Sequence, residues 1–498
     1  MTPRILLAVA GGILFALSFP DYSIGWLSFI AFVPLLIALR RARSGREAFL
    51  LAWLSQSVAW LMMVPWVVRV MSHYGGLPYP VGVLIFVAMS VYLGVYGAFF
   101  GLLVYRIRPQ SIGRWLLVPL AWVSIEYIRS HILSGFPWNL IATSLIDYTP
   151  LIQFDRVAGP YLVGVMILIP GTVLAWLIVE RPRGVGPIVA ISSTFMFLFI
   201  WWATGLVSSK LVVRPTGAPP VVAALLQPNI SQETRWDTQN TLDIFERMLA
   251  MTEEAIRGGA GIVIWPESTV PLSYSRDPMY RQAIESISAR SGVDILLGSV
   301  AEDSQRPDLI WNAAFLVSGG KTIGHYDKMH LVPFGEYVPM RKMLFFAGKL
   351  VRNVGEFSPG TNDIPLAGKF RYGMAICYEV VFPELTRKQV RNGADVLVTI
   401  TNDAWYDGTS APRQHLNMAR MRAIEDDRYL LRAATTGVSL IADPSGRIIE
   451  ELPMGRAGII YARFQPRTTI TPYVRFGDWF AWLALIAVII VSVRFKKR

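Results

Sequence analysis

Long, predominantly apolar stretches fill the chain up to about residue 210 and return near its end. A helix needs about 20 such residues to cross the hydrocarbon core of a bilayer. Eight stretches approach this length, and they lie at residues 5–19, 24–39, 49–71, 81–104, 114–133, 160–179, 187–206 and 477–493. The pattern therefore predicts eight transmembrane helices, seven of them before residue 210.

The pattern changes at residues 210–219, a linker that contains proline and glycine. From 220 to 466, short apolar and β-branched runs alternate with amphipathic helical stretches. The expected strands are VVAALLQ, GIVIW, DILLGSV, the hairpin NAAFLVS and KTIGHYD, YGMAICY, DVLVTIT, VSLIADP and RIIEEL, and the expected helices lie near 238–257, 279–290 and 412–427. This alternation is typical of an α/β domain whose helices cover buried sheets. We therefore expect a transmembrane domain (1–209), a linker (210–219), an α/β domain (220–466), and a last transmembrane helix with a tail (467–498).

Composition and charge support a membrane protein and fix an orientation. Of 498 residues, 53% are hydrophobic and only 16% are charged, and the net charge is +12. The charge does not indicate nucleic-acid binding, because the basic residues gather in alternate short loops, as they do on the cytoplasmic side of a membrane. These groups are Arg40, Arg41, Arg43 and Arg46; Arg106, Arg108 and Arg114; Arg181 and Arg183; and Arg494, Lys496, Lys497 and Arg498. Both termini are therefore expected in the cytoplasm and the α/β domain outside it.

Other features limit the possible chemistry. The five histidines are scattered and form no ligand cluster, so neither a metal nor another cofactor is expected. Cys377 is the single cysteine, which excludes an internal disulfide. The first span is either a signal peptide or an uncleaved anchor; the missing small-x-small cleavage pattern favours the anchor. The apolar run 343–351 is either a core segment or a lid that dips into the outer leaflet.

Three residues at expected strand ends can carry chemistry. Glu267 follows GIVIW in WPES and can act as a base, although a surface acid is the plainer reading. Lys328, in YDKMHLVPFGE, can stabilise an oxyanion, or it can be a solvated lysine paired with Asp327. Cys377 ends YGMAIC at a turn, where a nucleophile would be exposed, whereas free cysteines are most often inert and buried. Each residue alone is ambiguous.

The ordered set WPES, YDKMHLVPFGE and ICYE resembles the nitrilase superfamily. Joined to eight spans, with the domain outside, the chain is similar to the apolipoprotein N-acyltransferases of the bacterial inner membrane. The resemblance runs the whole length and includes SGFPWN (134–139), QPNISQETRW (227–236), NDAWYDG (402–408), QHLNMARMRAIE (414–425) and TPYVRFGDW (471–479). The QPN stretch and Tyr406 vary slightly from the family pattern, whereas the site positions match it.

The resemblance implies an α-β-β-α nitrilase-like sandwich in the periplasm and eight transmembrane helices. It implies that an acyl chain moves from the sn-1 position of a phospholipid, through a cysteine thioester, to the N-terminal S-diacylglyceryl-cysteine of an apolipoprotein. It assigns Glu267 as general base, Lys328 as oxyanion stabiliser and Cys377 as nucleophile. The further matched residues are Glu336, which would orient Lys328, Trp236, which would gate the entrance, and Tyr378 and Glu379 beside the nucleophile. A monomer without nucleic-acid partners is expected.

Two features of the fifth span also bear on the site. Glu126 and Arg129 are three residues apart, so they can pair with each other or recognise a lipid headgroup. Gly135 to Trp138, just beyond them, form either the floor of the cavity or a buried aromatic corner.

Two other functions remain open from the sequence. A membrane-anchored amidase or nitrilase would use the same triad, but it would not need eight spans. A transporter or scaffold with an inactive domain would not need Glu267, Lys328 and Cys377 to be intact.

Overall fold

The computed structural model describes residues 3–303, 306, 309–337 and 357–496. It divides the chain into two compact units. One comprises Met1–His73, Leu77–Leu211 and Phe476–Arg498, and the other Tyr74–Gly76 and Val212–Arg475. The apolar run 343–351, expected as a core segment or a lid, lies outside the described residues.

The first unit is helical, and every predicted apolar segment contains a helix. The long helices are α1 (Pro3–Leu17), α2 (Val33–Arg40), α3 (Gly45–Met63), α5 (Tyr79–Ile107), α7 (Leu117–His131), α9 (Asp155–Glu180), α10 (Gly186–Val212) and α17 (Trp479–Lys496). The short ones are η1 (Gly25–Phe29), α4 (Trp66–Arg69), η2 (Val70–Tyr74), α6 (Ile112–Trp115), η3 (Ile132–Ser134), η4 (Ile141–Leu145) and α8 (Thr149–Ile152).

Not all of these helices have the length of a span. Among the described residues, four are long and apolar enough to cross a membrane, or five if the bent pair Gly45–Met63 and Trp66–Tyr74 forms one span. Pro3–Leu17, Gly25–Arg40 and Trp479–Val493 are shorter apolar helices. The number eight therefore stays a prediction.

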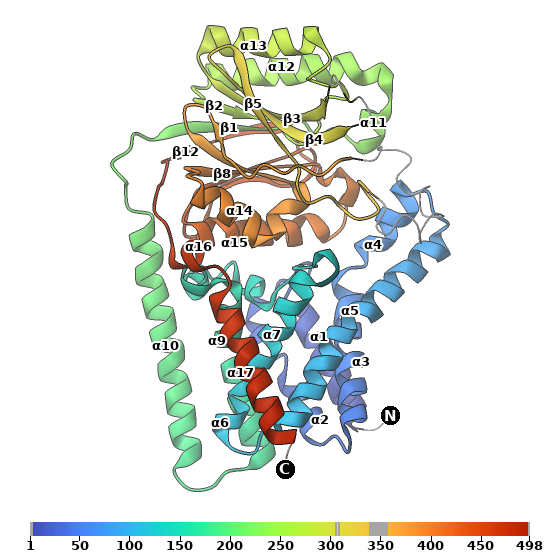
Figure 1. Cartoon of the computed structure of the whole chain (residues 1–498), viewed down its shortest axis with the longest axis vertical. Helices are drawn as coiled ribbons and strands as arrows, with labels where there is room; N and C mark the ends of the chain where they lie inside the picture. The colour runs from blue at the N-terminus through green and yellow to red at the C-terminus, as the bar shows by residue number, and fades with distance from the viewer. Residues whose placement is uncertain (1–2, 304–305, 307–308, 338–356, 497–498) are drawn as a thin grey trace. The chain divides into compact units, whose positions relative to one another are not determined.

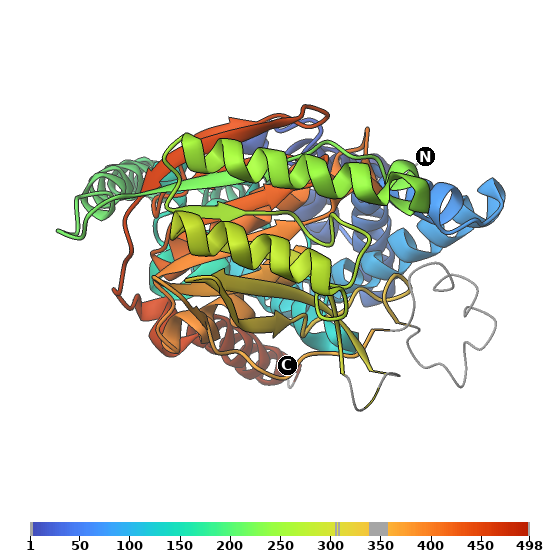
Figure 2. The same ribbon diagram turned by 90° about the horizontal axis from the view of Figure 1, so that it is seen from above.

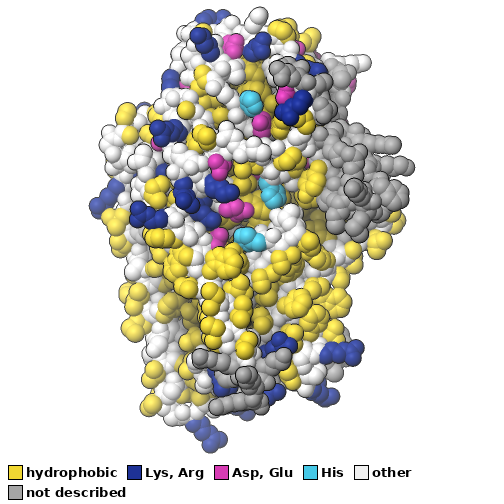
Figure 3. All heavy atoms as spheres, viewed as in Figure 1, with side chains coloured by type: hydrophobic (Ala, Val, Ile, Leu, Met, Phe, Trp, Pro, Cys, Tyr) yellow, Lys and Arg dark blue, Asp and Glu magenta, His cyan; other side chains and the backbone are white. Residues whose placement is uncertain are grey.

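The surface of the helical unit is apolar. Figure 3 shows hydrophobic side chains spread over its visible face. Large exposed residues repeat along α10 and α17, among them Phe195, Phe199, Leu483 and Ile490. Exposed apolar surface of this extent is typical of a protein that contacts lipid.

Glu126 and Arg129 form a buried pair, with Nη2 of Arg129 4.0 Å from Oε1 of Glu126. Arg129 also donates to the carbonyl oxygens of Phe136 and Trp138, both at 2.8 Å, and the backbone N–H of Ile141 donates to Glu126. These bonds satisfy the non-helical backbone that follows α7, which a bilayer interior requires. The pairing therefore supports a structural role for the two charges.

The described residues of the second unit form two six-stranded sheets. In sheet order, the first comprises β12 (Gly458–Phe464), β1 (Val221–Gln227), β2 (Ile262–Ile264), β3 (Asp294–Glu302), β4 (Ile310–Ser318) and β5 (Lys321–Asp327). The second comprises β11 (Ile448–Leu452), β10 (Ser439–Ala442), β9 (Leu430–Ala434), β8 (Val396–Thr401), β7 (Arg371–Ile376) and β6 (Leu366–Ala367). The helices are α11 (Gln232–Trp236), η5 (Thr238–Asn240), α12 (Thr241–Arg257), α13 (Pro278–Ser291), η7 (Cys377–Val381), α14 (Pro383–Arg391), η8 (Asp403–Tyr406), α15 (Ala411–Asp426) and α16 (Pro472–Phe476).

Alternation along the strands builds four layers. Inward residues such as Leu225, Ile264, Met374 and Val398 form a core between the sheets. The residues between them, such as Val263, pack against α12 and α13, which lie side by side over the first sheet (Figures 1 and 2). Helices α14 and α15 cover the second sheet. The α/β prediction with helices covering sheets is confirmed.

Several elements were not predicted from the sequence, among them β6, β9, β12, α11, α14 and α16. The strand β9, LLRAA, has an arginine at its centre, and Arg432 is nevertheless fully buried. Helix α14 is short and highly charged, so its buried face is narrow. On β9 a partner elsewhere in the fold overrides the local pattern, because Asp403 pairs with Arg432.

Candidate active site

Glu267 lies three residues beyond β2, with 6% of its surface exposed. Its Oε1 accepts a hydrogen bond of 2.7 Å from Nδ2 of Asn312 and lies 3.4 Å from Nζ of Lys328. Its Oε2 accepts the backbone N–H of Asn402 at 2.8 Å. The carboxylate is thus held on both oxygens, within a cluster built from three segments.

Lys328 follows β5 and is 1% exposed. Its ammonium lies 2.8 Å from Oε1 of Glu336, whose other oxygen accepts the backbone N–H of Val332. Burial disfavours the charge on Lys328, but the carboxylates of Glu336 and Glu267 outweigh burial and raise its pKa well above the ordinary value. Lys328 is therefore a fixed cation.

Cys377 follows β7 directly and begins η7, with a positive φ of 52°. This left-handed conformation is uncommon for a residue other than glycine, and it marks sharp strand-to-helix turns that present a nucleophile. Burial, and then the charge of Glu267, raise the pKa of the thiol, whereas Lys328 lowers it. The resting thiol is protonated, so its activation requires a nearby base.

Glu379 joins the Lys328 segment to the Cys377 turn. Its Oε1 accepts the backbone N–H groups of Met329 and His330 at 2.6 and 3.1 Å and the hydroxyl of Tyr326 at 3.0 Å. Its Oε2 accepts the backbone N–H of Ile376 at 2.8 Å. Burial raises the pKa of Glu379 to about 7, against these donors and Lys328, which lower it. The side chain is a clamp between the two segments that carry the cation and the thiol.

The structure thus brings Glu267, Lys328, Glu336, Cys377 and Glu379 together. Tyr378 is half-buried, and its ring packs edge-on to Phe382. Trp236 is the last residue of α11, and its side chain lies outside the described part.

Gly135 and Trp138 belong to the helical unit. Gly135 has a φ of 80°, and Trp138 is buried against Phe136 and Trp66. Their role as a cavity floor stays a prediction.

Asn312 and Asn402 are site residues that the sequence pattern did not single out. Asn312 bridges the two carboxylates that flank Lys328, because its Nδ2 also donates to Glu336 at 2.9 Å. Asn312 lies within a strand, where nothing in the local sequence indicates a functional residue. Asn402 is the first residue of NDAWYDG, one of the stretches that carry the family resemblance.

Gly298 on β3 leaves room for Glu267. A Cβ atom there would lie 2.7 Å from the Glu267 Cα atom. We expect Gly298→Ala to displace the Glu267 carboxylate. The rate of a reaction that uses this carboxylate, measured per molecule of folded enzyme, should therefore fall by about 100-fold.

Gly324→Ala is the matched control: Gly324 lies on the same sheet as Gly298, and its Cβ atom would be 3.6 Å from the nearest atom, in the side chain of Leu366. Equal rates in the two variants would contradict the assigned position of Glu267.

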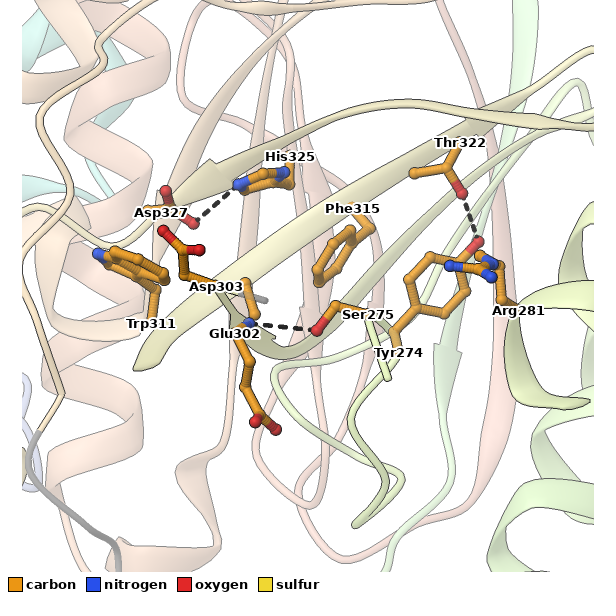
Figure 4. Close-up of a pocket in the computed structure, with 11 residues that line it drawn as sticks. Tyr274, Ser275, Arg281, Glu302, Asp303, Trp311, Phe315, Thr322, His325 and Asp327 are labelled. Carbon is orange, nitrogen blue, oxygen red and sulfur yellow. Dashed lines mark hydrogen bonds and ion pairs between the residues drawn. The ribbon is translucent and has the colours of Figure 1, made fainter. Parts of the chain in front are cut away.

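A separate hollow of about 380 Å³ lies beside β4 and β5, lined by Trp311, Phe315, His325 and Asp327 among others (Figure 4). Trp311 and Asn312 are neighbours on β4, so their side chains point to opposite faces of the sheet. The hollow therefore lies on the face away from Glu267. The hydrogen bond to Asp327 raises the pKa of His325.

The cluster has the parts needed for covalent acyl chemistry. They are a thiol on a turn with a left-handed backbone, a carboxylate close enough for its charge to act on that thiol, and a buried cation. The thiol can form an acyl intermediate, the carboxylate can move its proton, and the cation can stabilise an oxyanion.

Two residue ranges of the chain match known protein families. Residues 222–472 match the carbon-nitrogen hydrolase family, and residues 11–173 match the apolipoprotein N-acyltransferase N-terminal domain. Among solved structures, Saccharomyces cerevisiae Nit3, a member of branch 10 of the nitrilase superfamily, is 21% identical; the match covers 50% of this chain and 90% of Nit3, with a TM-score of 0.40.

Full-length relatives are closer in sequence. The apolipoprotein N-acyltransferase of Geobacter metallireducens is 36% identical over 504 residues, covering 99% of this chain and 95% of its own. That of Methylococcus capsulatus is 32% identical over 505 residues, covering 99% and 96%. The chain therefore belongs to the apolipoprotein N-acyltransferase family, and its residues 222–472 form a carbon-nitrogen hydrolase domain.

Proposed function

We propose that this enzyme transfers a fatty acyl chain from the sn-1 position of a membrane phospholipid to the α-amine of the N-terminal S-diacylglyceryl-cysteine of apolipoproteins. The observation that carries the proposal is the buried cluster of Cys377, Glu267 and Lys328. The names of the relatives supply the substrate class, because a thiol of this kind could otherwise serve an amidase.

In the first half-reaction, Glu267 accepts the proton of Cys377, and the thiolate attacks the ester carbonyl. Lys328 and the backbone N–H of Tyr378 stabilise the oxyanion. The C–O bond then breaks, the lysophospholipid alkoxide takes the proton from Glu267, and the acyl chain remains as a thioester on Cys377.

In the second half-reaction, the α-amine of the apolipoprotein attacks the thioester. Glu267 accepts a proton from this amine, the C–S bond breaks, and the thiolate recovers that proton. The products are an N-acylated lipoprotein and the free enzyme, so the reaction is ping-pong and needs no cofactor.

The membrane holds both substrates. We propose that the protein is a monomer that spans the bacterial inner membrane eight times, with the α/β domain in the periplasm and both termini in the cytoplasm. The alternate basic loops support this orientation. A chamber that opens to the outer leaflet would exclude the water that hydrolyses thioesters. We propose Gly135 and Trp138 for its floor and Trp236 for its entrance.

The first test is the intact mass of the enzyme after incubation with phospholipid alone. We expect an increment of one acyl chain that hydroxylamine removes, because hydroxylamine cleaves thioesters. The Cys377→Ala variant should carry no increment, and adding an S-diacylglyceryl peptide with a free N-terminus should discharge the wild-type adduct to an amide product.

A peptide with an acetylated N-terminus controls for the acceptor, since it has no free amine. Two results would contradict the proposal: no adduct on the wild-type enzyme, or the same adduct on Cys377→Ala. Hydrolysis of small amides without transfer would favour an amidase instead.

A further inference from the structure

The backbone carbonyl of Cys377 is held by a side chain from another element. His415, on α15, is 4% exposed, and its Nε2 lies 3.0 Å from the carbonyl oxygen of Cys377. A carbonyl oxygen only accepts hydrogen bonds, so Nε2 carries a proton and donates.

The other ring nitrogen determines the charge of His415. Its Nδ1 lies 3.1 Å from Nη2 of Arg432, which can only donate, and 3.4 Å from Oδ1 of Asp403, which can only accept. The contact with Arg432 is the shorter of the two, so we assign Nδ1 as an unprotonated acceptor. Burial, and then the charge of Arg432, lower the pKa of His415. The ring is therefore neutral, as its Nε2–H tautomer.

Arg432 and Asp403 hold this tautomer in place. Nη2 of Arg432 lies 2.7 Å from Oδ2 of Asp403, and both side chains are fully buried. Although burial alone would raise it, the pKa of Asp403 is lowered to about 2 by Arg432 and other partners. On β9, Leu431 and Ala433 point into the core between the sheets, so Arg432 points to the opposite face, which α15 covers.

We propose that His415 is a positioning residue for the nucleophile. Its Nε2–H bond holds the Cys377 carbonyl and so keeps this residue in the left-handed conformation that aims the thiol at Glu267 and Lys328. A left-handed conformation is unfavourable for a residue with a Cβ atom, so a hydrogen bond from another element is needed to hold the turn. The inference rests on the proposed role of Cys377.

A buried histidine that only supports the packing of α15 would have a different signature. It would lower stability without changing the reactivity of Cys377 in molecules that remain folded. Arg420 provides the comparison, because it is buried on the same helix and donates to a different backbone carbonyl, that of Gly446.

The experiment compares His415→Leu, His415→Gln and Arg420→Leu in the full-length enzyme. Two rates are measured on folded protein: acyl-enzyme formation from phospholipid, and alkylation of Cys377 by iodoacetamide, which reports on a single thiol. The melting temperature of each variant is measured alongside.

We expect His415→Leu to lower both rates at least tenfold. Because glutamine can place an N–H near the position of Nε2, His415→Gln should recover most of this loss. Arg420→Leu should lower the melting temperature and leave both rates near wild type.

Wild-type rates in His415→Leu would overturn the inference, as would losses in Arg420→Leu equal to those in His415→Leu. If the wild-type enzyme forms no acyl adduct, the proposed function fails, and the alkylation rates alone still decide whether His415 positions the thiol.

Discussion

Lys328→Met is expected to slow acyl-enzyme formation by about 10²–10³-fold, the usual cost of removing one oxyanion-stabilising donor. Methionine fills a similar volume without a charge, so the pocket keeps its shape. The variant also leaves Glu267 and Glu336 close together without the cation that now separates them.

Lys321→Met is the matched control, because Lys321 starts the strand that Lys328 follows and is exposed. Both variants are compared with wild type in single-turnover acylation, measured by intact mass, and in melting temperature. If Lys328→Met acylates at the wild-type rate, Lys328 does not stabilise the oxyanion.

The turn at Cys377 could be predicted from the sequence because its signals are local. Cys377 stands at the boundary between an apolar strand and a polar turn, and the structure places it there with the uncommon φ that such a turn requires. Glu267 and Lys328 were recognisable for a similar reason, since each follows a strand. Their meeting in one cluster came from the family resemblance, since strand order cannot be read from spacing alone.

The residues that support the cluster were harder to predict because their contacts are distant along the chain. Asn312 lies within a strand and resembles any other polar residue there, yet it joins two carboxylates. Arg432 interrupts an apolar strand, so the local pattern argued against β9. A charge can be fully buried at this position only because Asp403 pairs with it, and that pairing is visible only in the fold.

For the apolar segments, hydropathy alone predicts helices that are more continuous than those in the structure. The second apolar segment begins as the short η1, and helix α2 covers only Val33–Arg40. Helix α9 is broken at Gly159, whose φ is 70°, directly before Pro160. Hydropathy locates apolar segments, but it does not reveal where backbone geometry interrupts them.

Glu379→Gln is expected to lower both stability and activity, because this carboxylate only accepts hydrogen bonds and has four donors around it. An amide retains one accepting oxygen and turns an N–H₂ group toward a donor, for example the backbone N–H of Ile376. Leaving one buried donor unsatisfied costs about 1–3 kcal/mol. The same change loosens the link between the Lys328 segment and the Cys377 turn, so acyl-enzyme formation per folded molecule should fall at least tenfold.

Glu384→Gln controls for the loss of a negative charge nearby, since Glu384 is half-buried in the first turn of α14. Its effect should be limited to the interaction of one charge with a helix end, about 0.3–1 kcal/mol, with acylation unchanged. Comparing the two variants distinguishes the specific hydrogen bonds of Glu379 from the general effect of losing one negative charge in this region. If Glu379→Gln melts at a lower temperature but acylates at the wild-type rate, Glu379 stabilises the fold without positioning the lysine and the thiol.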